Sequence, residues 1–337
     1  MSWLEGRWYS EKPAPCVLKP FSSLYKFLAK RKKGADLQQV WVAPVPVIIV
    51  GNINVGGTGK TPLTISLVER LKREGYKPGI ISRGYKSKAT QFPFDVTTAD
   101  SPELSGDEPF MLAKRCRCPV IIDPNRPNAA KYLLDNYECD LIISDDGLQH
   151  YRLDRDIEIA VIDGKRGLGN RALMPAGPLR EEPDRLCSVD LIVSNGRLQN
   201  KIAEAATIEE MFLQPAAIVN CLTDEELALE ALRSKQVHAV AGIGNPQRFF
   251  NTLEQELQVT VIPHAKPDHS FYTVEDFQFG DDYPVIMTEK DAVKVTEFAQ
   301  SHCWYLQIKA QLPESFYTQL LDKLKIAIAN KGKTQNG

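Results

Sequence analysis

Residues 51–62, GNINVGGTGKTP, constrain the fold of this 337-residue chain more than any other segment. The apolar run 45–50 comes before them. Apolar residues at helical spacing follow: Leu63, Leu67, Val68 and Leu71. A strand, a glycine-rich loop and a helix in this order form a P-loop, in which backbone N–H groups cradle phosphate. The segment therefore predicts a nucleotide-phosphate site at the start of a helix.

Eight residues of this loop are predicted to contact the nucleotide: Asn54, Val55, Gly56, Gly57, Thr58, Gly59, Lys60 and Thr61. The three glycines let the chain wrap closely around a phosphate. Lys60 can reach the β- and γ-phosphates, and the Thr61 hydroxyl can ligate Mg²⁺. The strict P-loop pattern has glycine at position 54, where this chain has asparagine. Asparagine tolerates a positive φ better than most residues, so the turn remains feasible.

A second buried strand is predicted at 140–144, directly before Asp145 and Asp146. Taken alone, Asp-Asp-Gly is typical of a turn. Downstream of a P-loop, an acid at the end of a strand is placed to hold Mg²⁺ or its water shell. Because ligands bind at the carboxyl ends of strands in open α/β sheets, Asp145 and Asp146 are candidate metal residues beside Thr61.

The remaining pattern alternates strands with helices. Strands are predicted at 77–82, 119–122, 157–162 and 191–194, and helices at 107–115 and 127–136. This predicts an α/β fold with a P-loop NTPase-like, mostly parallel sheet flanked by helices. Beyond residue 200 the pattern restarts, with strands at 237–241, 259–263 and 284–288 and a helix at 246–257. We expect three parts: 1–40, 41–200 as the P-loop core, and 201–330 as a smaller C-terminal α/β lobe that closes over the active site. Residues 330–337 are expected to fray.

The first 33 residues carry eight Lys or Arg and two acids, although the whole chain has a net charge of −2. Apolar residues recur at helical spacing at positions 17, 18, 21, 24, 25 and 28. This predicts a basic amphipathic helix, which either lies in a membrane interface or packs on its own domain. The overall charge argues against a nucleic-acid partner. The seven cysteines include no CxxC pair, which argues against a disulfide framework. The sequence has no apolar segment of the about 20 residues needed to span a bilayer. Together these features predict a cytosolic chain.

Seven motifs follow one another along the chain: GNINVGGTGKTP (51–62), SRGY (82–85), SGDEPFMLA (105–113), ISDDGLQH (143–150), GLGN with LMPAGPLREE (167–182), PDHSFY (267–272) and MTEKDAVK (287–294). In this order they resemble the tetraacyldisaccharide 4′-kinase family, the lipid A 4′-kinases of Gram-negative bacteria. The resemblance implies phosphate transfer from ATP, with Mg²⁺, to the 4′-hydroxyl of a lipid disaccharide 1-phosphate. It also implies docking of the N-terminal segment on the cytoplasmic face of the inner membrane. It implies no obligate protein partner.

The resemblance also assigns catalytic roles. Asp107 matches the family's proposed base, His269 matches a histidine that pairs with it, and Lys60 completes the set. Because His269 belongs to the second lobe, the pair is expected to form when the lobes close. From residue type alone, Asp107 could equally be a helix N-cap, since an apolar helix follows it. A lone histidine such as His269 is by default a satisfied polar residue.

Further candidates follow from the same motifs. Glu181 is a candidate for Mg²⁺. Arg180 is a candidate for the substrate phosphate, because a planar guanidinium suits a phosphate well. Arg83, Glu108, Gln149 and His150 are also substrate or phosphate candidates. Arg83 and Arg126 could instead form ordinary surface ion pairs, and Gln149 and His150 could cap the strand end. Lys86 stands where the family usually has glycine, which puts the local backbone in question.

Two other classes remain open from the residues alone. A switch or metal-insertion GTPase shares the GGxGKT loop, but its guanine-specific N/T-K-x-D pattern is not matched by residues 288–291, in which lysine and aspartate are adjacent. An ATP-dependent ligase on the same core would leave the basic N-terminal segment unexplained.

Overall fold

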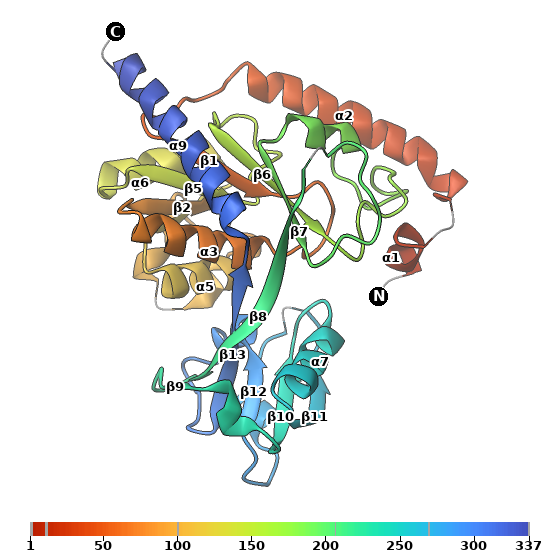
Figure 1. Cartoon of the computed structure of the whole chain (residues 1–337), viewed down its shortest axis with the longest axis vertical. Coiled ribbons are helices and arrows are strands. Elements are labelled where there is room, and N and C mark those ends of the chain that lie inside the picture. Colours follow the sequence, from red (N-terminus) through yellow and green to blue (C-terminus); the bar gives the residue numbers. More distant parts are fainter. Residues whose placement is uncertain (1–2, 11–12, 100, 206, 269, 336–337) are drawn as a thin grey trace.

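Two lobes, joined by two long strands, make up the molecule (Figure 1). The computed structural model describes residues 3–10, 13–99, 101–205, 207–268 and 270–335. The joining strands are β8 (Glu209–Asn220) and β13 (Cys303–Gln311), which pair antiparallel with Gln214 opposite Lys309. We call the described residues within 214–309 the small lobe and the other described residues the P-loop lobe.

The P-loop lobe is built on a mostly parallel sheet with the strand order β8-β7-β6-β1-β5-β2-β4-β3. Its strands are β1 (Val47–Gly51), β2 (Pro78–Ser82), β3 (Phe94–Asp95), β4 (Val120–Ile122), β5 (Leu141–Asp145), β6 (Ile157–Asp163) and β7 (Leu191–Asn195). Of these, only β3 runs antiparallel to its neighbour. The strands are rich in Val and Ile because such a sheet is covered on both faces. The predicted fold class is confirmed.

Helices cover both faces of this sheet: α3 (Lys60–Arg73), α5 (Asp107–Cys116) and α9 (Glu314–Gln335) pack on one face, and α6 (Arg126–Asn136) packs on the other. The lobe also contains α1 (Trp3–Trp8), α2 (Lys19–Leu37) and α4 (Pro102–Ser105). Alternate residues of β1 enter different cores. Ile48 and Val50 pack with side chains of α3, α5 and α9, whereas Val47 and Ile49 pack with side chains of α6. The P-loop strand is thus fixed between two hydrophobic layers.

The small lobe has its own cores and continues the sheet in the order β11-β10-β12-β13-β8. Its further elements are β9 (Glu226–Leu227), β10 (Gln236–Ala241), α7 (Pro246–Glu256), β11 (Thr260–Ala265), β12 (Val285–Thr288) and α8 (Glu289–Ala292). The three strands and the long helix predicted beyond residue 200 are therefore present. Each lies within about two residues of its expected position.

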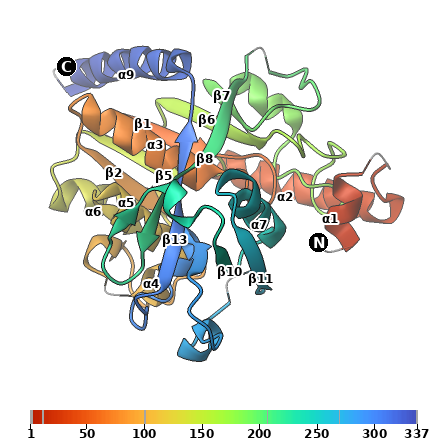
Figure 2. The same ribbon diagram turned by 60° about the horizontal axis from the view of Figure 1, so that its bottom comes forward.

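The last helix, α9, does not belong to the small lobe. Figure 2 shows it on the P-loop lobe, away from α7 and β10. Its buried side chains Phe316, Leu320 and Leu324 join the core that contains α3 and α5. The predicted boundaries 201–330 are therefore wrong at both ends, because α9 belongs to the P-loop lobe and Ile202 packs in the P-loop core with Val47 and Ile49. The expected fraying is also wrong as far as Gln335, because α9 is helical to that residue. The spacing of the apolar residues indicates a helix face but not the surface that the face covers.

The predicted N-terminal helix is present as α2, and it both packs on the domain and exposes apolar residues. The Ser22 hydroxyl donates to the Leu173 carbonyl at 2.8 Å, and the Tyr25 hydroxyl donates to the Arg180 carbonyl at 3.0 Å. Exposed apolar side chains occupy the rest of this segment: Val17, Phe21, Leu24, Phe27 and Leu28. Among the helices that the structure describes, none combines the length and apolar character that crossing a bilayer requires.

Candidate active site

A cleft of about 1470 Å³ separates the carboxyl edge of the P-loop sheet from the small lobe. Strands β1, β5 and β2 run parallel, so the segments that follow them meet at this edge. The predicted site residues that line the cleft are Val55, Gly56, Gly57, Lys60, Arg83, Asp107, Glu108, Asp145, Asp146, Gln149, His150 and Arg180. The small lobe contributes Asn245, Arg248 and Lys290, and α2 contributes Tyr25 and Lys32.

The P-loop has the backbone that its glycines allow. Gly56 and Gly59 have φ values of 105° and 96°. A Cβ atom at Gly59 would lie 2.6 Å from Nδ2 of Asn195, so only glycine fits there. Asn54 does not have the positive φ that the sequence analysis considered. It is buried, and its Nδ2 donates to the Gly167 carbonyl at 2.9 Å. The asparagine therefore anchors the loop through its side chain.

Two asparagines that sequence reasoning missed hold the loop in shape. Asn52 Nδ2 donates to the Thr58 hydroxyl at 3.2 Å, and Asn195 Nδ2 donates to the Thr58 carbonyl at 3.1 Å. Gln149 Nε2 in turn donates to the Asn52 carbonyl at 3.1 Å. Asn52 directly follows the P-loop strand β1, which is a detectable signal in the sequence. Asn195 comes from the end of β7, and no local pattern places it at the P-loop.

Asp146 lies between two cations. Its Oδ1 is 3.5 Å from Lys60 Nζ and 3.1 Å from Arg180 Nη1. Burial by itself would raise the pKa of Asp146, but the charges of Lys60 and Arg180 outweigh burial and leave it lowered. Asp146 is therefore a fixed anion. Arg180, predicted to bind a substrate phosphate, is an ion-pair partner of this carboxylate.

Asp145 has the opposite environment. It is buried at the end of β5, and the Thr64 hydroxyl donates to its Oδ1 at 3.5 Å. Burial, followed by the charge of Glu108, raises the pKa of Asp145 to about 7. A buried carboxylate of this kind suits a divalent cation as a counter-charge. In the described part of the chain, no three His, Cys, Asp or Glu side chains form a metal cluster. The two neighbouring carboxylates are oxygen ligands of the kind that suits Mg²⁺, which keeps several of its waters. Thr61 is the second residue of α3 and is not among the residues that line the cleft.

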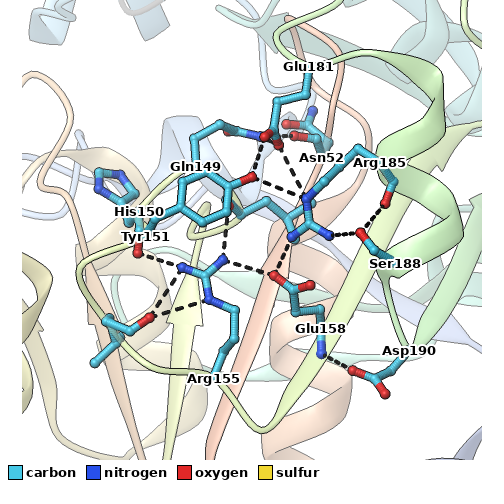
Figure 3. A network of polar contacts seen from close by, with 12 residues as sticks. Asn52, Gln149, His150, Tyr151, Arg155, Glu158, Glu181, Arg185, Ser188 and Asp190 are labelled. Atoms are coloured by element: carbon cyan, nitrogen blue, oxygen red, sulfur yellow. Dashed lines mark hydrogen bonds and ion pairs between the residues drawn. The ribbon is translucent and has the colours of Figure 1, made fainter. Parts of the chain in front are cut away.

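Glu181 belongs to a network of polar contacts that includes Gln149, Tyr151 and Arg185 (Figure 3). Its Oε2 accepts from Gln149 Nε2 at 3.0 Å and lies 3.7 Å from Arg185 Nε, and its Oε1 accepts from the Tyr151 hydroxyl. Gln149 Oε1 accepts from Arg180 Nη1 at 3.4 Å. Since both Glu181 oxygens already have partners, the geometry favours a role in orienting Gln149 and Arg180. Sequence reasoning missed Tyr151 and Arg185, whose contacts depend on how the 147–190 segment folds back.

A group of basic side chains lies on the other side of the acidic pair. Arg126 is almost fully buried, with Nη1 donating to the Asp123 carbonyl and Nη2 to the Asp145 carbonyl, while its Nε has no partner. Burial lowers the pKa of Arg126 to about 10. Burial and then the charges of Arg126 and Lys32 lower the pKa of His150 to about 3. Arg126 is therefore not a surface residue, whereas Arg83 is exposed.

The loop that carries Arg83 adopts the backbone that the family's glycine would give it. Lys86 has a φ of 60°, so a lysine occupies a left-handed position. Gly84 also has a positive φ, and a Cβ atom there would lie 2.7 Å from a side-chain carbon of Ile122. The substitution at position 86 therefore leaves the loop conformation in place.

Asp107 faces the small lobe. It is the first residue of α5, and Gly106 occupies the N-cap position, so Asp107 does not act as the N-cap. Lys294 Nζ lies 3.6 Å from Asp107 Oδ2, and Lys290 Nζ lies 3.7 Å from Glu108 Oε1. These ion pairs cross the cleft. His269, the predicted partner of Asp107, lies outside the described residues.

Comparison with known proteins gives a consistent result. Residues 14–325 match the LpxK family, described as tetraacyldisaccharide-1-P 4′-kinase. The tetraacyldisaccharide 4′-kinase of Pseudomonas fluorescens SBW25 is 48% identical, covering 94% of this chain and 93% of that protein. The enzyme of the same name from Nitrosococcus oceani is 43% identical, covering 96% and 95%.

Solved structures agree with the sequence relatives. A crystal structure of LpxK from Aquifex aeolicus in complex with ATP superposes with a TM-score of 0.78 at 28% identity, covering 93% of this chain and 98% of that chain. The chain has a P-loop at the carboxyl edge of a parallel sheet, and its relatives match it over nearly their full length. We conclude that this chain belongs to the tetraacyldisaccharide-1-P 4′-kinase family.

Proposed function

We propose that this chain transfers the γ-phosphate of ATP to the 4′-hydroxyl of tetraacyldisaccharide 1-phosphate, a step of lipid A biosynthesis. The observation that carries the proposal is the cleft itself, in which a P-loop lysine and an acidic pair share one space with the carboxylate of Asp107. Family membership supports the choice of acceptor. The closely matched structure was solved in complex with ATP, which supports ATP as the donor.

In this proposal the P-loop holds the β- and γ-phosphates. Backbone N–H groups and the N-terminal end of α3 present partial positive charge, and Lys60 adds a full one. Thr61, Asp145 and Asp146 would hold Mg²⁺, whose charge would neutralise the phosphate oxygens. The contact between Lys60 and Asp146 keeps the lysine at the mouth of the loop. Arg180 fixes the Asp146 carboxylate from its other side.

The acceptor hydroxyl needs a base, and Asp107 is the candidate. In the proposed step, the carboxylate of Asp107 takes the proton of the 4′-hydroxyl. The hydroxyl oxygen then bonds to the γ-phosphorus, and the bond from that phosphorus to the ADP oxygen breaks. His269 is proposed to pair with Asp107. Closure of the small lobe would bring the pair together and exclude water from the reaction.

The acceptor is anionic and lipidic, and two surfaces suit those properties. Arg83, the buried Arg126 and Lys32 of α2 place positive charge in the cleft near His150, which suits a sugar phosphate. The exposed apolar side chains of α2, with the basic residues of the same helix, support docking on an anionic membrane surface. We propose that this surface is the cytoplasmic face of the bacterial inner membrane.

The test is transfer of radioactive phosphate from γ-labelled ATP to detergent-dispersed tetraacyldisaccharide 1-phosphate in the presence of Mg²⁺. Label in the lipid is the expected result. A parallel reaction uses an acceptor that lacks the 4′-hydroxyl, and this reaction should give no labelled lipid. ATP hydrolysis without labelled lipid, or a preference for GTP over ATP, would contradict the proposal.

A further inference from the structure

A fully buried aspartate organises the side of the small lobe that faces the cleft. Asp291 Oδ2 accepts from the Gly242 backbone N–H at 3.0 Å and from the Thr288 hydroxyl at 2.6 Å. Its Oδ1 accepts from the Tyr272 hydroxyl at 2.9 Å and from Lys294 Nζ at 3.1 Å. The carboxylate has no exposed surface. Lys294 supplies the counter-charge that a buried carboxylate requires.

The geometry of this cluster is closely determined. A Cβ atom at Gly242 would lie 2.5 Å from the Tyr272 hydroxyl and 3.0 Å from Asp291 Oδ1, so the turn after β10 has no room for a side chain. Tyr272 belongs to the same short segment as His269, and its side chain ties the end of that segment to Asp291. Burial and then the charge of Asp291 raise the pKa of Tyr272, so Tyr272 stays protonated and acts as a donor.

Lys294 extends from this cluster across the cleft. Its side chain is only 9% exposed, and its Nζ lies within 4 Å of two carboxylates: Asp291 on its own lobe and Asp107 on the other. Other charged groups near Asp107 are Glu108 on the same helix and, from the small lobe, Lys290, which bridges Glu108 and Asp268. Lys294 is thus the ammonium placed on Asp107, whereas Lys290 belongs to the neighbouring pair.

We infer that Lys294 is a positioning residue for the reaction: held by Asp291, it orients the Asp107 carboxylate within the cleft and couples that orientation to the approach of the small lobe. The inference rests on the proposed function, in which Asp107 takes the acceptor proton. Without the Lys294 contact, the Asp107 carboxylate would be held less firmly and would meet the hydroxyl in the correct geometry less often, so the loss should appear in kcat. ATP binds on the P-loop lobe, so KM for ATP should change little.

The main variant is Lys294→Met, with Lys294→Arg as the charge-conserving variant. We expect Lys294→Met to lower kcat for lipid phosphorylation about tenfold or more. KM for ATP should stay within about twofold, and Lys294→Arg should recover most of the lost kcat. The matched control is Lys266→Met. It removes a small-lobe ammonium that pairs with Asp276 and does not line the cleft, and it should leave kcat nearly unchanged.

Lys294→Met leaves Asp291 buried without its counter-charge and could unfold the lobe. The double variant Lys294→Met with Asp291→Asn avoids this, because the neutral amide can keep hydrogen-bond partners. A folded double variant with wild-type kcat would overturn the inference. The inference would also be overturned if Lys266→Met lowered kcat as much as Lys294→Met does and Lys294→Arg did not restore it.

A second readout does not depend on the reaction. The ammonium signal of Lys294 in a proton–nitrogen NMR spectrum is assigned from its absence in Lys294→Arg. It should shift in Asp107→Asn and stay in place in Glu108→Gln. A signal indifferent to Asp107→Asn would overturn the inference whatever the activity. Absence of lipid phosphorylation by the unaltered protein would contradict the proposed function instead.

Discussion

Asp145 and Asp146 are neighbours in the chain, yet their carboxylates meet opposite surroundings. Asp146 contacts Lys60 and Arg180 and keeps a lowered pKa. Asp145 is buried behind it, and burial raises its pKa to about 7. At neutral pH one carboxylate is a permanent anion, whereas the other is close to its titration point before any cation arrives. Two carboxylates that are adjacent in the chain therefore differ in protonation chemistry.

Asp107→Asn tests the proposed base. The amide keeps the size of the side chain but cannot take a proton, so we expect lipid phosphorylation to fall by a factor of about 10² to 10⁴. ATP binding should stay near the wild-type value, because the P-loop is unchanged. Transfer rates and calorimetric ATP affinity are the measurements, with Glu103→Gln, an exposed carboxylate outside the cleft that pairs with Lys88, as the control. Transfer at the wild-type rate by Asp107→Asn would remove Asp107 from the base role.

His150 makes the fold sensitive to acid. Burial and then the charges of Arg126 and Lys32 lower its pKa from 6.5 to about 3, so the unfolded chain binds a proton at a higher pH than the folded chain does. The stability that neutral His150 contributes is present above pH 6.5 and is lost as the pH falls toward 3. Between pH 7.5 and 5.5 this loss amounts to about 1.4 kcal/mol.

The matching variant is His150→Gln, which cannot take up the proton. Urea unfolding at both pH values should show that this variant loses about 1.4 kcal/mol less than the wild type over that range. An equal loss in both proteins would show that His150 is not the acid-sensitive group.

At the scale of elements, the helix α2 packs on the P-loop lobe and also exposes apolar side chains. Ser22 and Tyr25 fix it to the 173–180 segment, and the exposed apolar residues point elsewhere. The basic residues of the segment, in a chain that is slightly acidic overall, favour an anionic surface as the partner. The helix is therefore held in a fixed orientation on the domain, with its apolar side chains available.

Replacing Phe21 or Phe27 by serine should weaken binding to anionic vesicles about tenfold each, because each ring contributes apolar area to the interface. Co-sedimentation with vesicles measures the affinity. Leu222→Ser is the matched control, since Leu222 is similarly exposed but lies in the small lobe. Equal affinity for the vesicles in the Phe21 variant and the wild type would argue that α2 does not enter the interface.

The elements that sequence could predict are those with continuous local patterns. Strands β1, β2, β4, β5, β6 and β7 contain short runs of Val, Ile or Leu between turn residues, and each lies within about two residues of its predicted position. The two-residue strand β3 has no such run and was not predicted. The strands β8 and β13 mix polar and apolar residues, β8 contains Pro215, and their pairing joins positions about 90 residues apart. No local signal indicates such a pair.

The residues of the candidate site also divide into those with a local sequence signal and those without one. Lys60, Asp145 and Asp146 were found because the backbone that places them is encoded beside them. Thr64 lies one turn beyond the motif. Asn195 and Lys294 act where distant segments meet. Glu181 stays a prediction for the metal, and the structure adds its contacts with Tyr151 and Arg185, which are remote from the P-loop in sequence.

At the scale of the whole molecule, the small lobe is an insertion into the P-loop lobe. The chain leaves through β8, returns through β13 and ends in the P-loop core as α9. The points of exit and return, Gln214 and Lys309, are cross-strand neighbours. A lobe with its own cores and adjacent ends has the properties of an independent folding unit.

We therefore expect residues 214–309, expressed alone, to fold with a single cooperative thermal transition. A fragment of 201–330, which carries part of α9 without its binding surface, should aggregate because Phe316, Leu320 and Leu324 would be exposed. Circular dichroism melting and size-exclusion chromatography compare the two fragments. A disordered 214–309 fragment would contradict the assignment of the lobe as an insertion.

The position of α9 also sets an order of events during synthesis. At ordinary elongation rates the ribosome needs roughly 20 to 70 s to make this chain. The segment that completes the P-loop core, through Phe316, Leu320 and Leu324, emerges after the whole small lobe. The small lobe can fold while translation continues, but the nucleotide-binding half keeps an open apolar surface until α9 has left the ribosome. A ribosome-bound nascent chain can therefore contain a folded small lobe within a P-loop lobe that is not yet folded.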